Sequence, residues 1–224
     1  MLLAILAFLL GGLAVALLYQ LEVFGNSSSS SSEGSGVPAT QTRAVAPFSS
    51  VELTGGNNVV IRVGEKQSVV VKADDNLLNR VTTHVKSDAL VIGNTPGSLT
   101  AKSPMSVEVN VPSLNALALT GSGNIMVSGI KTESLTVTLS GSGNLFGSGT
   151  ATSLDITVSG FGNARFTQLD ANNVHAVVSG SGEIFVTATK SLDASVPGSG
   201  TIMYEGNPQD VTKSVTGSGA ITGR

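Results

Sequence analysis

Three side chains of this sequence have the types and the spacing that a reactive or metal-binding site would need. Asp155, His175 and Asp193 follow one another at intervals of 20 and 18 residues. If the chain folds with a matching period, the three side chains stack on adjacent turns. Two carboxylates beside an imidazole favour its charged form, and such a set could hold a divalent metal ion weakly. The alternative, which we favour, is a solvated, charge-compensated column without a metal.

The rest of the sequence offers little for catalysis. It has no cysteine and only two histidines, His84 and His175, so Cys-ligated zinc and thiol chemistry are excluded. Asp74 and Asp75 lie beside Asn76 without the glycine and distal glutamate of a calcium loop, which favours a turn. A net charge of −3 and 4% aromatic residues do not suit nucleic acid. We expect no enzyme activity, no cofactor and no nucleic-acid partner.

A short repeat explains the spacing of these residues. Six Gly-x-Gly turns begin 20, 19, 20, 18 and 19 residues apart. Each is interpreted as a corner where close stacking of backbones, or a positive φ, leaves no room for a Cβ. A phosphate-binding loop is not indicated, because no strand–loop–helix context surrounds the glycines. The corner glycines are Gly121, Gly123, Gly141, Gly143, Gly160, Gly162, Gly180, Gly182, Gly198, Gly200, Gly217 and Gly219.

Apolar residues alternate with polar ones on both sides of each corner. Leu135, Val137 and Leu139 precede one corner, and Leu145 follows it. Period-2 alternation predicts strands with one buried face. Two strands joined by a glycine corner make one coil, and coils stacked about 4.8 Å apart bury their apolar faces together. The sequence therefore predicts an all-β parallel solenoid with coils of about 19 residues.

Three outward columns follow from this register. One contains the asparagines Asn124, Asn144 and Asn163, and is predicted to form a ladder of side-chain amides with a structural role. The second contains the Asp–His–Asp set described above. The third is small, level and rich in hydroxyl groups, so it could meet a glycan, another cell surface or ice, or simply suit a strand surface. Its members are Thr138, Thr157, Val177, Ser195 and Ser214. Thr136 and Thr212 belong to the second column, one at each end of the Asp–His–Asp set.

The two ends of the solenoid are predicted to differ. Residues 44–115 lack the short period and are expected to form wider first coils or a β cap that closes the apolar end, whereas residues 116–224 form the short-coil solenoid. In the last repeat Lys213 takes an interior position between Val211 and Val215. Either the final coil bulges there, or its end is open to water.

The N-terminal region indicates an extracellular location. Residues 2–18 are an unbroken apolar run, which as a helix spans about 26 Å of a hydrocarbon core about 30 Å thick. Residues 1–24 are predicted to form an apolar helix that serves as a membrane anchor, a filament stem or a cleaved signal. Residues 25–43 are Ser/Gly-rich and predict a flexible linker. Asn26 matches an N-glycosylation acceptor, although a solvated spacer is the favoured interpretation.

The order of these features resembles a known family. The segment 48–93 with its DDNLL turn, the segment 111–125 (VPSLNALALTGSGNI) and GSGTIMYEGNP at 198–207 are similar to the bacterial auto-transporter adhesin head GIN domain family, over about residues 44–224. The resemblance implies a right-handed parallel β-helix-like domain at the cell surface or in the envelope. It brings no catalytic or binding residues with it.

These observations predict a non-enzymatic extracellular module with a structural or adhesive role. Residues 1–24 would attach it to a membrane or to copies of itself, and a surface glycan or protein is the expected ligand. The alternative is a pilin-like filament subunit, a homo-oligomer whose N-terminal helix packs in the filament core. A polysaccharide-acting enzyme is a third hypothesis, because β-helix folds also host lyases and hydrolases.

Overall fold

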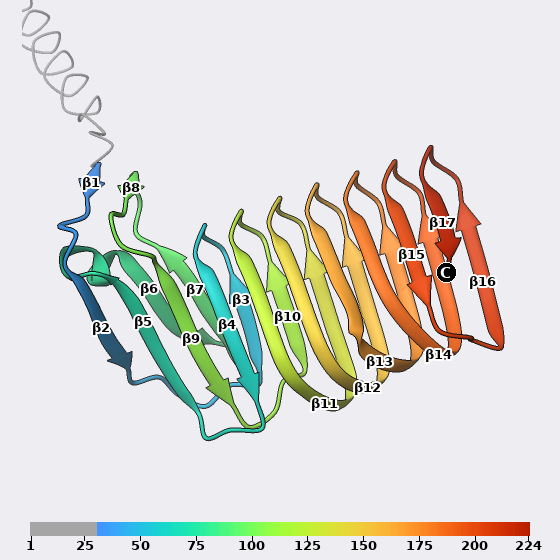
Figure 1. The fold of residues 1–224 in the computed structure, drawn as a ribbon, viewed down its shortest axis with the longest axis horizontal. Coiled ribbons are helices and arrows are strands. Elements are labelled where there is room, and N and C mark those ends of the chain that lie inside the picture. Colours follow the sequence, from blue (N-terminus) through green and yellow to red (C-terminus); the bar gives the residue numbers. More distant parts are fainter. Residues whose placement is uncertain (1–30) are drawn as a thin grey trace, which may run out of the picture. The chain divides into compact units, whose positions relative to one another are not determined.

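Strands make up 64% of residues 31–224, the part of the chain that the computed structural model describes (Figure 1). They form a β-solenoid of about five turns, which confirms the predicted all-β class and solenoid architecture. The predicted apolar helix at 1–24 and the acceptor Asn26 lie outside the described residues. Within residues 31–224 the helical structure is one short 3₁₀ helix, η1 (Asp75–Arg80), and no helix there is long and apolar enough to cross a membrane.

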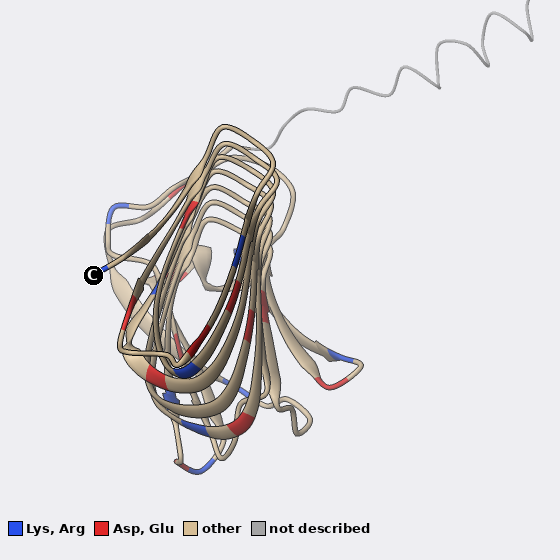
Figure 2. Cartoon of the chain, turned by 90° about the vertical axis from the view of Figure 1, so that its right-hand side faces the viewer, with Lys and Arg blue, Asp and Glu red and all other residues tan. Residues whose placement is uncertain are grey.

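Each turn of the solenoid crosses two sheets, because the long strands bend partway along their length. In β12 (Asn144–Val158), residues 144–147 pair with the first half of β11 (Asn124–Leu139), and residues 149–158 pair with its second half. We call the sheet of first halves face B and the sheet of second halves face A. Seen end-on, the coils superpose as flattened loops with two long sides (Figure 2).

The same parallel pairing continues along the whole stack. The long strands β13 and β14 cross both faces as β11 and β12 do, and shorter strands extend each face at its ends. The bounds are β3 (Ser50–Leu53), β10 (Ala116–Leu119) and β16 (Asp210–Val215) on face A, β4 (Asn58–Val63), β15 (Thr201–Glu205) and β17 (Ala220–Gly223) on face B, and β13 (Asn163–Val178) and β14 (Glu183–Val196) on both.

Side chains alternate between interior and solvent along each coil, as the period-2 pattern predicts. In β12, Leu145, Ile156 and Val158 are buried, and each pairs in register with a buried apolar residue of β11. Phe166 of β13 fills the interior beside Gly147, where a Cβ would lie 2.2 Å from its ring. The core is therefore a set of apolar ladders that no coil could bury alone.

Strands that break the parallel pattern close the N-terminal end of the stack. β7 (Ala89–Asn94) and β9 (Ser106–Val111) run parallel to β3 and β4 and form an outer coil. Beyond them, β5 (Ser68–Asp74) and β6 (Val81–Lys86) pair antiparallel with β9 and β7. η1 packs against β5 and buries Leu77 at this end. Together with β2 (Pro38–Arg43), which pairs with β5, the elements β5, β6, β7, β9 and η1 form what we call the cap.

Part of the predicted linker is folded. The described residues include β1 (Ser32–Glu33), which pairs with β8 (Leu99–Thr100), and β2 (Pro38–Arg43), which pairs antiparallel with β5. The prediction of a flexible linker over residues 25–43 therefore does not hold for 38–43. Most β2 side chains are exposed, so the strand is defined by backbone pairing, and apolar alternation gave no signal for it.

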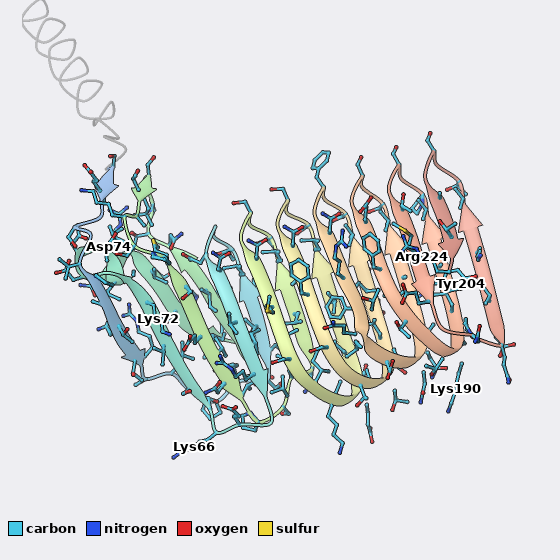
Figure 3. All side chains as sticks on the ribbon, in the orientation of Figure 1. Lys66, Lys72, Asp74, Lys190, Tyr204 and Arg224 are labelled. Carbon is cyan, nitrogen blue, oxygen red and sulfur yellow. The ribbon has the colours of Figure 1, made fainter. Side chains whose placement is uncertain are left out.

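The Asp74 side chain at the end of β5 is fully buried and binds the segment that follows β8 (Figure 3 labels Asp74). The backbone N–H of Lys102 donates to its Oδ2 at 2.8 Å, and that of Ser103 donates to its Oδ1 at 3.1 Å. Hydrogen bonding from Ser103, with further bonds from backbone N–H groups, lowers the Asp74 pKa against the opposing effect of burial. Asp75 starts η1 and accepts the N–H of Asn76, so the predicted turn-forming role holds for Asp75, whereas the Asp74 carboxylate makes no cap hydrogen bond to η1 and binds a distant segment instead.

The C-terminal end of the stack is exposed in the structure. β16 pairs with β14 without any shift of register, so the final coil does not bulge at Lys213. Instead, the Lys213 ammonium reaches the ring of Tyr204 at 4.7 Å from its centroid, and Val211 and Val215 remain exposed (Figure 3 labels Tyr204). Of the two predicted arrangements, the structure shows the end that is open to water.

Candidate functional site

The glycine corners form a closely stacked ridge along one edge of the solenoid. At each of the twelve predicted corner glycines, a Cβ would lie between 1.8 and 2.3 Å from a carbonyl oxygen of the neighbouring coil. None of the twelve has a positive φ, so close stacking excludes the side chain. The corner amides are already used, since the N–H groups of Ser142 and Asn144 donate to the carbonyls of Gly121 and Gly123. The ridge therefore offers no cradle for a phosphate.

The predicted asparagine ladder is present and runs beside this ridge on face B. Asn144 donates from Nδ2 to Oδ1 of Asn124 at 2.9 Å, and Asn163 donates to Asn144 at 3.1 Å. Asn124 continues the chain by donating to Asn58 at 2.9 Å. The sequence reading missed Asn58, because the first coil has Gly55-Gly56 in place of the Gly-x-Gly spacing.

On face A, the structure brings the predicted charged column together. Asp155, His175 and Asp193 are register partners on β12, β13 and β14. His175 Nδ1 lies 3.3 Å from Asp193 Oδ2, and both side chains are half exposed. Among residues 31–224 no group of three His, Cys, Asp or Glu side chains is placed to hold a metal ion. The geometry therefore does not build the weak divalent-metal site considered above.

The rest of face A is level and polar, as the predicted columns require. Thr138, Thr157 and Val177 pair in register across three coils, and the same column continues through Ser195 to Ser214. A hollow of about 430 Å³ lies over the Asp–His–Asp column and also meets Asp210. The outward columns of this face carry hydroxyl, carboxylate and imidazole groups and Val177 but no aromatic or methionine side chain, so they offer no large anchor for tight burial of a ligand.

Face B carries a column that the sequence analysis did not identify. Its members are large, and they pair in register one per coil. Met126 is 56% exposed and Phe146 is 36% exposed. The Arg165 guanidinium stacks over the ring of Phe185, 4.3 Å from its centroid. We call the column the face-B ladder: Met126, Phe146, Arg165, Phe185 and Met203.

A bulge in β13 turns the middle of this ladder into a hollow. Phe146 pairs with Arg165, but two residues later Ser148 pairs with Gln168, so β13 carries one extra residue there. Against β14, Phe166 is paired and the next paired residue is Asp170. The resulting hollow has a volume of about 300 Å³, and its lining includes Met126, Phe146, Ser148, Arg165 and Gln168. Bulges of this kind re-aim side chains and are common beside functional sites.

A simple signal would have located the ladder. The fifth residue after the first glycine of the first five corners runs Met126, Phe146, Arg165, Phe185 and Met203, and the sixth corner has Thr222 there. A search for repetition passes over this position, because the residue type changes from coil to coil. What its members share is size, on a surface otherwise made of small polar side chains.

Comparisons with known proteins agree with the fold. The sequence profile of the family described as "Putative auto-transporter adhesin, head GIN domain" matches residues 47–208. No curated protein matches the chain.

Several solved structures resemble the chain. A putative adhesin from Bacteroides fragilis is 24% identical, with a TM-score of 0.72, over 86% of this chain and 100% of that one. A putative lipid binding protein from Parabacteroides distasonis is 22% identical, with a TM-score of 0.58, over 87% of this chain and 100% of that one. A putative adhesin from the same species is 20% identical, with a TM-score of 0.57 and the same coverage. At these identities the likeness shows the fold alone.

Proposed function

The chain belongs to the auto-transporter adhesin, head GIN domain family, and from this premise we propose that it is a non-enzymatic adhesive module of the cell surface. In this proposal a rigid, right-handed solenoid holds a ligand against face B, and residues 1–24 keep the module at the surface. The solenoid itself does not react. It supplies a fixed array of side chains, so that the entropy cost of binding is small.

One observation carries this proposal: two large apolar side chains of the ladder, Met126 and Phe146, lie exposed side by side on a mostly polar sheet, whereas Phe185 is only 9% exposed. Met126 and Phe146 occupy adjacent coils, and Phe161, which is 76% exposed, stands at the corner that begins the next coil. Burying such side chains is favourable at roughly 25 cal/mol per Å² of apolar surface. Exposed apolar groups gathered in one place mark interaction sites more often than chance placement does.

The same observation separates face B from face A as the adhesive surface. Face A is built mainly from threonine, serine and short charged side chains, whose exposure to water carries no free-energy penalty. The face-B ladder instead exposes a thioether and an aromatic ring beside a guanidinium, which are among the groups enriched at the energetic centres of interfaces. A passive structural rod would have no use for this row.

The test is adhesion of beads that carry the full chain to an array of immobilised neutral oligosaccharides, acidic oligosaccharides and extracellular matrix proteins. We expect retention on at least one class of spot. The double variant Met126→Ser with Phe146→Ser should lose most of the retained beads, because each weakened contact lowers the avidity of the whole bead.

The matched control is a double variant on face A, Thr138→Ser with Thr157→Ser, which changes the same number of outward side chains on the same two coils. It should keep the wild-type retention. Retention on no spot at all, or an equal loss in both double variants, would contradict an adhesive role for face B.

A further inference from the structure

We propose that the hollow at the centre of the face-B ladder binds a glycan that carries carboxylate groups, with one acidic group held by Arg165. This inference rests on the proposed function, because it names the ligand class of the same face. Three neighbouring strands, β11, β12 and β13, contribute the lining. Its volume of about 300 Å³ falls at the lower end of small-molecule pockets, which run from about 300 to 1,000 Å³.

Arg165 is arranged to receive an anion. The central carbon of its guanidinium lies over the Phe185 ring, 4.3 Å from the ring centroid, and a guanidinium packed on an aromatic ring keeps N–H donors available at its edge. Among residues 31–224 no ion pair involves Arg165, and Glu183 on the next coil makes none with it. A carboxylate of a ligand could therefore accept two parallel hydrogen bonds from this rim.

Other charges lie near the ladder but outside the lining of the hollow; at the far end of the ladder, the Arg224 guanidinium lies 3.7 Å from Met203 Sδ. Glu108 continues the outward column on the cap side, beyond Val60. It already has a partner, since Lys72 Nζ lies 2.7 Å from its Oε1 and this hydrogen bond lowers the Glu108 pKa. Arg165 is thus the one cation in the lining of the hollow.

Phe146 and Met126 supply the second half of the recognition. They precede Arg165 on the two neighbouring coils, which are about 4.8 Å apart. A pyranose ring has an apolar C–H face that packs on an aromatic ring. A sugar on Phe146 therefore places its substituents one coil away from Arg165, within reach of a carboxylate at its edge.

The walls of the hollow carry the polar groups that sugar hydroxyls need. The bulge in β13 sets Thr167 and Gln168 along one side, and Ser148 and Ser128 line the same side on the two preceding coils. The Ser148 hydroxyl donates to the carbonyl of Val127 at 3.5 Å, so its lone pairs remain available to a ligand. Hydroxyl and amide groups beside an apolar floor match a saccharide.

Two other ligand classes fit this geometry less well. An extended peptide binds a sheet through free backbone groups at an edge, but the ladder lies in mid-sheet, where each coil pairs with the coils on both sides of it. An acyl chain needs a deep apolar groove, and this hollow is shallow and has serine, threonine and glutamine along its side.

The experiment measures binding of the full chain in detergent micelles to three uronate-containing oligosaccharides, from galacturonan, mannuronan and hyaluronan. Each is compared with its own methyl ester, which has the same shape but no charge. We expect at least one uronate to bind and its ester to bind about tenfold more weakly or worse. Arg165→Gln should weaken the uronate about tenfold and the ester hardly at all, whereas Arg165→Lys should fall between the wild type and Arg165→Gln.

His175→Gln is the matched control, because it changes an exposed titratable side chain on face A of the same strand. It should bind all oligosaccharides as the wild type does. Equal affinity for uronate and ester, an unchanged uronate affinity in Arg165→Gln, or binding of none of the three uronates would overturn the inference. If bead retention still depends on Phe146 in that case, the adhesive face stands and only its ligand class is wrong. If retention is also insensitive, both proposals fail.

Discussion

The glycine ridge has two residues per coil and the face-B ladder has one, and the two differ in what repeats. Along the ridge the same residue type recurs, because every corner meets the carbonyl of its neighbour at a distance that only glycine allows. Along the ladder the residue changes from methionine to phenylalanine to arginine. The two columns lie only a few residues apart on each strand.

This difference shows at which positions the fold determines the residue type. A position that faces a neighbouring backbone has one physical solution, so a repeat detects it. A position that faces solvent has many solutions, and a large side chain there is not required by the stacking of coils. Repetition therefore identifies the fold, and departure from repetition at an outward position indicates function.

The largest loss of stability is expected when a methyl group is added to a glycine of the ridge. In Gly143→Ala the new Cβ would lie 1.8 Å from the carbonyl oxygen of Gly123, so two coils must separate where Asn144 N–H bonds the same oxygen. We expect a loss of about 3 kcal/mol, which far exceeds the gain of up to about 1 kcal/mol from a less flexible unfolded chain. Urea denaturation followed by circular dichroism measures the effect.

Ser142→Ala is the control for this variant, because Ser142 lies between Gly141 and Gly143 and is exposed. It should unfold within about 0.5 kcal/mol of the wild type. A Gly143→Ala protein as stable as the wild type would mean that the corners can open without cost, and that the recurrence of glycine has another cause.

The next largest effect is expected at the cap. The folded state lowers the Asp74 pKa below its ordinary value of 3.8, mainly through hydrogen bonding from Ser103. Because the folded pKa is the lower one, the stability that Asp74 contributes is complete above about pH 4 and is lost as the pH falls through the folded pKa. The urea midpoint should therefore fall as the pH decreases below 4, and Asp74→Asn should lower the midpoint at pH 7 and flatten this decrease.

Asp75→Asn, at an exposed neighbour, is the control. Equal pH profiles for Asp74→Asn and the wild type would contradict this role of Asp74.

Much of the solenoid could be predicted from the sequence, because its physics is periodic. The alternation of Leu135, Val137 and Leu139 and the glycines at fixed intervals specify strands, corners and register together. The column Asp155, His175 and Asp193 was aligned for the same reason. The register predicts that these residues align, but it does not predict the distances between their side chains. Alignment on adjacent coils does not by itself bring three side chains around one metal ion.

The parts that were missed lack periodicity. β2 is held by backbone pairing to β5 while its side chains face solvent, so no apolar pattern reports it. The outer coil of β7 and β9 follows β3 and β4 in sequence but lies beyond them in the stack, an order that no linear repeat implies. The bulge at Thr167 and Gln168 is one extra residue on one strand, and its consequence for the surface appears only in three dimensions.

A smaller effect is expected for the asparagine ladder, which combines features of both columns. Asn144 bonds Asn124 and Asn163 at once, so Asn144→Ala removes two side-chain hydrogen bonds at a partly exposed site. Each is worth about 1 kcal/mol, and we expect a loss of about 1–2 kcal/mol in urea denaturation. Asn58→Ala, at the end of the ladder, breaks one bond and should lose about half as much. Equal losses in the two variants would mean that the ladder does not act as a chain of pairwise bonds.

The smallest effect on folding is expected where the effect on binding is largest. Phe146 faces solvent, whereas Leu145, its neighbour in β12, is fully buried. Leu145→Ala should cost about 3 kcal/mol of stability, and Phe146→Ser should change it by no more than about 0.5 kcal/mol, both measured by urea denaturation. A Phe146→Ser protein that loses stability as Leu145→Ala does would show that the ring is part of the fold, and the contrast between ridge and ladder would disappear. A fully stable Phe146→Ser protein that no longer binds would instead show that the ring serves recognition, because it would then contribute to binding and not to folding.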